Sequence, residues 1–95
     1  MSSLYTFVFE VAGGTFVSQA SGNDHNEAAQ DWFQNLSSNV PANTLSEISV
    51  AELKAQVDDK ELGLAALNNV KNAWCLSTMS DQGYLLVNVV KTQGD

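Results

Sequence analysis

The feature that most constrains the fold is a pair of hairpin patterns, one near each end of the chain. In the first, residues 4–11 alternate large apolar side chains with smaller or polar ones, as a strand buried on one face does. The dipeptide Gly13-Gly14 follows, and glycines tolerate the positive φ angles of tight hairpin turns. The segment TFVSQA then returns as a second strand. A two-residue loop at the glycines would pair Val11 with Phe16 and keep the aromatic face continuous.

The second hairpin pattern, residues 72–91, is apolar on both faces. Its SDQG segment suits a type I turn with Gly83 in the left-handed region, which predicts a three-residue loop. On that register one face carries Cys75, Ser77, Met79, Leu85, Val87 and Val89. The opposite face carries Trp74, Leu76, Thr78, Tyr84, Leu86, Asn88 and Val90. A two-residue loop at Gln82-Gly83 would slip the pairing by one residue and still leave apolar groups on both faces.

Strands that lose the alternation of apolar and polar residues are typical of a sheet covered on both sides. Either residues 39–71 wrap around to the second face, or a second chain covers it. Large exposed apolar patches on soluble proteins mark interaction sites, and sheets paired across a two-fold axis are a common arrangement. The predicted interface consists of Trp74, Leu76, Tyr84, Leu86 and Val90.

After the first hairpin the sequence changes to a helical period. Asp24 and Glu27 have the spacing of a capping box, so a helix is expected from about residue 24 to residue 36. Its apolar stripe consists of Ala28, Ala29, Trp32, Phe33 and Leu36. This stripe is expected to pack on the aromatic face of the first hairpin.

The middle of the chain holds two more helical candidates. Ser49 and Glu52 form a second capping box, which predicts a helix beginning there. Residues 58–70 are a third candidate, weakened by Gly63. Ninety-five residues leave room for one core, so residues 1–95 are expected to form a single small domain. The predicted fold class is α+β: a four-stranded, mainly antiparallel sheet in ββα(αα)ββ order, with helices packed mainly on one face.

Charge narrows the classes of partner. Four lysines, no arginine and eleven acids give a net charge of −7 at pH 7. Nucleic-acid binding requires Lys and Arg to neutralise phosphates, so neither a nucleic acid nor a membrane is an expected partner. The apolar runs are too short to span a bilayer, and the first ten residues lack the basic start of a signal peptide. Cys75 is the single cysteine, which favours a reducing compartment, and the expected location is cytoplasmic.

No motif of specific chemistry occurs in the sequence. Cys75 and His25 are the only thiol and imidazole, and a nucleophile–base pair requires them within hydrogen-bond reach. Cys75 lies in an apolar strand, where a thiol is expected to be inert. Asp24, Glu27 and Asp31 offer acid pairs, although acids at a helix start already have a capping role. One Cys and one His cannot furnish a structural zinc tetrad, so no metal and no other cofactor is expected.

The opening stretch YTFVFEVAGGTFVSQASGNDHNEAAQDWF, about a third of the chain, resembles the start of HicB-like antitoxin domains. In both, a glycine-rich hairpin is followed by a helix with an acidic EA start. The chain lacks that family's Pro/Gly segment between strand and helix, and it lacks a DNA-binding tail. The resemblance therefore implies only the local order of hairpin and helix.

The function predicted from these patterns is that of a small acidic interaction or regulatory module without catalytic activity. Its partner is expected to be another protein or a second copy of the chain. One alternative is a small-molecule-binding domain with a pocket between the first helix and the sheet, near Tyr5, Phe7 and Trp32. A further alternative is an enzyme built on Cys75 or on a pair of acids.

Overall fold

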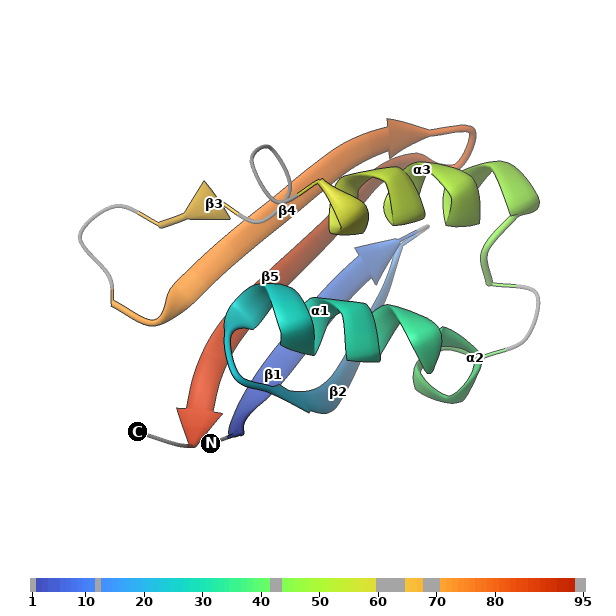
Figure 1. Ribbon diagram of the computed structural model, residues 1–95. Helices are drawn as coiled ribbons and strands as arrows, with labels where there is room; N and C mark the ends of the chain where they lie inside the picture. The colour runs from blue at the N-terminus through green and yellow to red at the C-terminus, as the bar shows by residue number, and fades with distance from the viewer. Residues whose placement is uncertain (1, 12, 42–43, 60–64, 68–70, 94–95) are drawn as a thin grey trace.

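The computed structural model describes residues 2–11, 13–41, 44–59, 65–67 and 71–93. An antiparallel sheet is lined by helices along one side (Figure 1). In chain order the elements are β1 (Ser3–Val11), β2 (Gly14–Gly22), α1 (His25–Gln34), α2 (Leu36–Asn39), α3 (Glu47–Asp58), β3 (Ala65–Ala66), β4 (Ala73–Ser80) and β5 (Gly83–Gln93). The predicted α+β class and the antiparallel pairing are confirmed.

The strand order is β2-β1-β5-β4-β3, so the two hairpins join through the first and last long strands of the chain. Glu10 pairs with Leu86 at one end of the β1–β5 ladder, and Leu4 pairs with Gln93 at the other. A register shift between Leu4 and Tyr5 adds one residue on β5. The start of β1 therefore lies beside the end of β5 (Figure 1).

The sheet has five strands among the described residues, not the predicted four. The additional strand is β3, in which Ala65 pairs with Cys75 and Ala66 pairs with Trp74. The prediction of a helix over residues 58–70 is therefore wrong at these two alanines, because they extend the sheet along β4. Residues 60–64 and 68–70 lie outside the described residues.

The first hairpin turns one residue earlier than expected. Gly13 has a φ of 81°, while Gly14 already pairs with Val11 as the first residue of β2. Phe16 consequently pairs with Phe9 rather than with Val11, so the predicted register is wrong by two residues. A shift of two keeps every side chain on its face, and the prediction that the aromatic residues of β1 share one side is confirmed.

The second hairpin turns more tightly than the predicted three-residue loop. Ser80 pairs with Gly83, which has a φ of 90°, and only two residues connect the strands. The Ser80 hydroxyl donates to the Gly83 carbonyl oxygen (3.0 Å) and accepts from the Gln82 backbone N–H (3.1 Å), which closes this turn. The result is a register one residue away from the predicted one.

This slip moves Trp74 and Leu76 to the other side of the sheet. Trp74 pairs with Val89 and Leu76 pairs with Val87, and both lie on the side that the helices cover. The predicted common face with Tyr84, Leu86 and Val90 is thus wrong, because a one-residue slip reverses every side chain of a strand.

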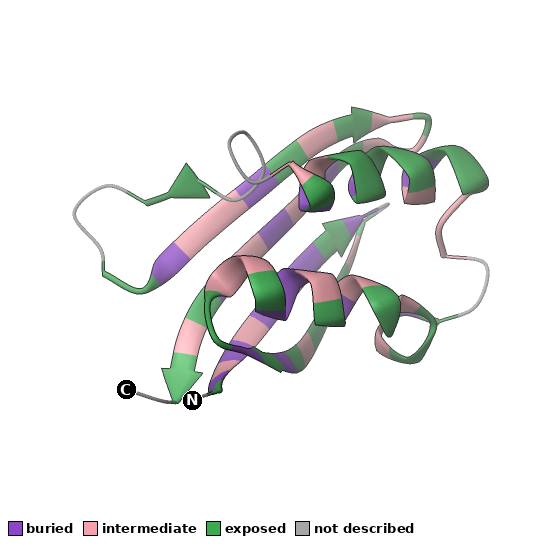
Figure 2. Ribbon diagram, in the orientation of Figure 1, coloured by how far each residue is buried: buried purple, intermediate pink, exposed green. Residues whose placement is uncertain are grey.

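We call the helix-lined side of the sheet the covered face. Its strand residues include Tyr5, Phe7, Phe9, Val11, Leu76, Leu85, Val87 and Val89, all at most 3% exposed. Figure 2 shows this burial as alternating purple segments along the strands beneath the helices. Burying so many large side chains is the main source of stability in a chain of this size.

Helix α1 supplies the centre of the core. The indole of Trp32 stacks on Phe7, with ring centroids 5.1 Å apart, and meets Phe9 edge-on at 5.4 Å. Its Nε1 donates to the Ser18 hydroxyl (2.9 Å), so the buried indole N–H has a partner. Asp24 caps the helix as predicted, since its Oδ1 accepts from the Glu27 backbone N–H (2.8 Å).

Helix α3 begins earlier than predicted. Ser46, not Ser49, is its N-cap, and the Ser46 hydroxyl accepts from the Ser49 backbone N–H (3.0 Å). Leu53 and Val57, four residues apart on α3, are buried on one side of the helix. The Ser46 hydroxyl also donates to Asp81 Oδ1 (2.7 Å), which ties the start of α3 to the β4–β5 turn.

Candidate interaction face

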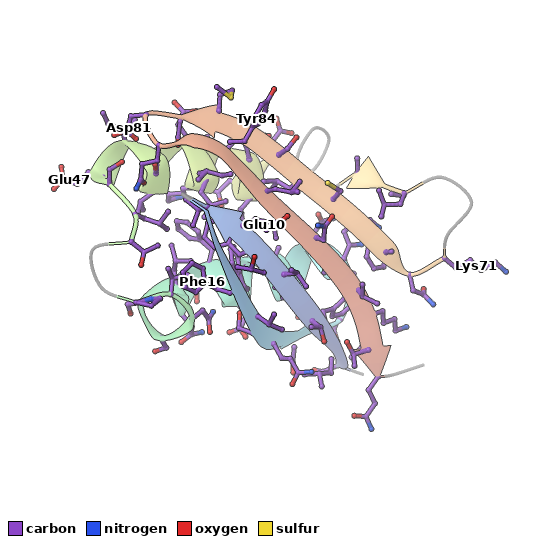
Figure 3. The ribbon with its side chains drawn as sticks, turned by 180° about the vertical axis from the view of Figure 1, so that it is seen from behind. Glu10, Phe16, Glu47, Lys71, Asp81 and Tyr84 are labelled. Carbon is purple, nitrogen blue, oxygen red and sulfur yellow. The ribbon has the colours of Figure 1, made fainter. Side chains whose placement is uncertain are left out.

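The side of the sheet opposite the helices is the strongest candidate for a functional surface, and we call it the open face. In Figure 3, which shows the molecule from behind, Glu10 and Tyr84 lie on it and the described helices lie beyond it. Strand pairing assigns seventeen residues of the four long strands to it: Leu4, Thr6, Val8, Glu10, Thr15, Val17, Gln19, Ser21, Ala73, Cys75, Ser77, Met79, Tyr84, Leu86, Asn88, Val90 and Gln93.

Large apolar side chains on this face meet solvent. Tyr84 is 70% exposed, Val17 66%, Met79 57% and Val90 47%. Met79 pairs with Tyr84 across β4 and β5, and Val8 pairs with Val17 across β1 and β2, so the apolar groups lie over adjacent strands. Several exposed large apolar side chains on one face of a sheet mark a candidate binding site.

Charge is nearly absent from the open face. Glu10 is its only charged residue among the seventeen, whereas 16% of the residues in the whole chain are charged. The acids are concentrated in the helical layer instead: Asp24, Glu27, Asp31, Glu47, Glu52, Asp58 and Asp59 lie in α1, in α3 or at their caps. Depletion of charge is characteristic of the centres of protein interfaces.

Polar side chains at one end of the open face bond to one another. Gln19 Nε2 donates to Thr6 Oγ1 (3.1 Å), and Thr6 Oγ1 also shares a hydrogen bond with Thr92 Oγ1. These contacts cross β2, β1 and β5, so the three side chains satisfy part of their hydrogen-bonding capacity without water. Covering them with a partner therefore costs less than covering unpaired polar groups.

The opposite end of the face is hollowed. A depression of about 320 Å³ lies between the β1–β2 turn and β5. Its lining residues are Glu10, Val11, Gly13, Gly14, Thr15, Tyr84 and Leu86. The exposed ring of Tyr84 and the side chain of Leu86 border this hollow, which gives the face a shape that a partner side chain could fill.

The five residues predicted as an interface are divided by the sheet. Tyr84, Leu86 and Val90 lie on the open face, while Trp74 and Leu76 lie on the covered face. Their binding role stays a prediction. Sequence reasoning missed Val8, Val17 and Met79, which take the place of Trp74 and Leu76 on the open face. The available signal was the period-two spacing of Thr15, Val17 and Gln19, which places Val17 on the same face of the strand as two polar residues.

Trp74 belongs to an aromatic cluster on the covered side. The imidazole of His25 stacks on its indole, with ring centroids 4.3 Å apart and planes 15° apart, and Tyr5 lies 5.9 Å from it. Burial lowers the pKa of His25, and the Asp24 carboxylate opposes this shift. Burial, and secondarily the Asp24 charge, raises the pKa of Tyr5. The cluster docks the start of α1 onto β4.

The candidate thiol and base are not brought together. Cys75 pairs with Asn88 on the open face, whereas His25 stacks on the covered side, so the sheet lies between them. Asp24 and Glu27 are engaged at the start of α1, where Glu27 Oε1 accepts from the Asn23 backbone N–H (3.2 Å). Among the residues that the structure describes, no three His, Cys, Asp or Glu gather where they could hold a metal ion.

The predicted ligand pocket near Tyr5, Phe7 and Trp32 is filled by those side chains, which are at most 3% exposed. A cleft of about 410 Å³ lies elsewhere, at the end of α1. Its lining residues are Phe33, Gln34, Leu36, Ser37, Val40, Pro41, Leu45 and Val50. Sequence patterns did not indicate this cleft, because it depends on how the segment after α1 meets the start of α3.

Comparison of the chain with protein-family models, with curated proteins and with solved structures found no match in any of the three. The resemblance of the opening stretch to HicB-like antitoxin domains therefore has no support from a family match. Within the described ranges, no helix is long and apolar enough to cross a membrane.

Proposed function

We propose that the protein is a non-catalytic interaction module of the cytoplasm that binds a protein partner through the open face. The observation that carries the proposal is a four-strand surface with exposed Tyr84, Val17, Met79 and Val90 and a single charge, Glu10. A face of this kind gains free energy when it is covered, because apolar area leaves water and no charged group except Glu10 must be desolvated.

Tyr84 and Leu86 are the proposed anchors of the interaction. Tyrosine is enriched among residues that dominate binding energy, and Tyr84 combines high exposure with a position beside the hollow at Glu10. Leu86 lies on β5, a strand inside the sheet, and is paired with Ser77 on one side and Glu10 on the other. The polar contacts of Thr6 and Gln19 then form the rim.

The test is quantitative capture of partners from an extract of the source cells by immobilised protein. Leu86→Lys and Val17→Lys each place a charge on the open face, and both should lose the partners that the wild type retains. Ile48→Lys is the matched control, because Ile48 is 57% exposed on α3 in the helical layer. Circular dichroism and urea unfolding establish that each variant folds.

Retention of every partner by folded Leu86→Lys and Val17→Lys would overturn the proposed site. Equal losses with Ile48→Lys would also overturn it, since the helical layer would then contribute as much as the open face. A selective loss with the two open-face variants would support it.

A second candidate function is suggested by the cleft at the end of α1, whose apolar lining includes Phe33, Leu36 and Val50. Clefts with apolar walls and few polar groups are typical of small-molecule sites. A ligand that binds there should raise the melting temperature of the wild type and not of Leu36→Lys. Equal shifts in both proteins would exclude the cleft as the binding site.

A further inference from the structure

Resting on the proposed function, the distribution of charge indicates which partner the open face fits. Each chain carries a net charge of −7, so two copies repel one another at long range. Seven of the nine acids in the described residues lie in the helical layer or at its caps, and only Glu10 lies on the open face. The open face is therefore the broad surface on which two copies can meet with the least repulsion.

We propose that the partner is a second copy of this chain, packed open face to open face across a two-fold axis. The two sheets would form the centre of a four-layer sandwich with helices outside. Face-packed sheets lie about 10 Å apart, and each helical layer adds roughly another 10 Å. The two acidic layers would then be separated by about 30 Å, well beyond the Debye length of about 8 Å at physiological salt.

The same distribution argues against a basic partner as the occupant. A cationic surface would gain most from contact with the acids of α1 and α3, which point away from the open face. On the open face it would find only Glu10. A second copy instead brings an apolar surface of the same composition, with the same Thr6 and Gln19 contacts at its rim.

The size of the face fits a dimer of modest affinity. Four strands spaced by about 4.8 Å and roughly eight residues long at 3.3 Å per residue cover on the order of 500 Å². Two such faces would bury about 1,000 Å² in total, at the lower limit for specific interfaces. The dimer is therefore expected to dissociate on dilution. Tyr84, which lines the hollow beside Glu10, would be its aromatic anchor.

Sedimentation velocity over a roughly hundredfold range of concentration tests this proposal at low and at high salt. The mass should move from monomer to dimer as concentration rises, and added salt should strengthen the dimer several-fold because it screens the repulsion between the two chains. Glu10→Gln should strengthen the dimer at low salt. At high salt, where the repulsion between the chains is screened, Leu86→Lys and Val17→Lys should abolish the dimer and Ile48→Lys should leave it unchanged.

Three results would overturn the dimer. A protein that stays monomeric throughout excludes it, and the proposed function then stands or falls with the capture experiment, which does not depend on self-association. A dimer that weakens as salt increases would be held by opposite charges. A dimer that survives Leu86→Lys, with folding confirmed by urea unfolding, would be formed elsewhere, for example through the outer edge of β2.

Discussion

The two faces of one sheet have comparable apolar content in β5 but different environments. Leu85, Val87 and Val89 point to the helices and are at most 2% exposed, whereas Tyr84 and Val90 point to the open face and are 70% and 47% exposed. Composition does not separate the two sets. The difference arises because α1 and α3 both lie on one side of the sheet (Figure 1). An apolar side chain of β5 is therefore buried only if it points to the side that the helices cover.

The largest expected contrast is in stability. Phe7→Ala removes a ring that is fully buried against Trp32 and should lower the free energy of unfolding by about 3–5 kcal/mol. Val17→Ala on the open face should change it by no more than about 0.5 kcal/mol in the monomer. Urea unfolding of both variants at low protein concentration measures the difference. Similar losses would mean that the open face is buried in the folded chain.

The close approach of α1 to β2 predicts different losses of stability for substitutions at two neighbouring residues of β2, Gly22 and Ser21. A Cβ added at Gly22 would lie 2.4 Å from the backbone nitrogen of Ala28, so the helix must shift to accommodate it. Gly22→Ala should therefore destabilise the protein by about 1–3 kcal/mol. Ser21→Ala, on the exposed side of the same strand, is the control and should be nearly neutral. A tolerated Gly22→Ala would show that α1 is not fixed against β2.

The attachment of α3 to the second hairpin is the next test. Ser46→Ala removes the helix cap and the hydrogen bond to Asp81, and should cost about 1 kcal/mol. Ser77→Ala on the open face of β4 should cost less. Because the hydrogen bond from Ser46 lowers the pKa of Asp81, the wild type should lose stability as pH falls through that lowered pKa, and Ser46→Ala should lose less. Unfolding midpoints of the three proteins at several acidic pH values measure both effects.

The smallest expected effect concerns His25 on the covered side. Its lowered pKa means that the unfolded chain binds a proton at higher pH than the folded chain does. The associated stability is present above about pH 6.5 and is lost as pH falls toward the pKa of the folded state. His25→Phe keeps a ring against Trp74 and should lose less stability between pH 7 and about pH 5. An identical pH profile in both proteins would contradict the lowered pKa of the half-buried His25.

The local features of the fold were predictable from sequence. The alternation of Tyr5, Phe7 and Phe9 indicated the buried side of β1, and Asp24 indicated the start of α1, because both signals are complete within a few residues. The pairing of Trp32 with that aromatic side followed from the helical spacing.

The register of the second hairpin was not predictable in the same way. The register decides on which side of the sheet Trp74 lies, and the β4–β5 turn sets the register. Contacts from a distant segment hold this turn: Gln82 Oε1 accepts from the Ser46 backbone N–H (2.9 Å), and Asp81 accepts from the hydroxyls of Ser46 and Ser49. Ser49 has the capping-box partner Glu52, yet Ser46 is the cap, and Ser46 is the residue that these tertiary contacts hold against the turn. A slip of one residue therefore moved two predicted interface residues to the covered side.

The central claim, that the open face is where a partner binds, is tested most directly by methyl NMR spectra recorded over a wide range of protein concentration. The methyl groups of Val8, Val17, Leu86 and Val90 on the open face should shift as the dimer forms. Those of Leu53, Leu85, Val87 and Val89 on the covered side should stay in place. Shifts confined to the covered side or to the helices, or no shifts in a protein that sedimentation shows to be dimeric, would contradict the account.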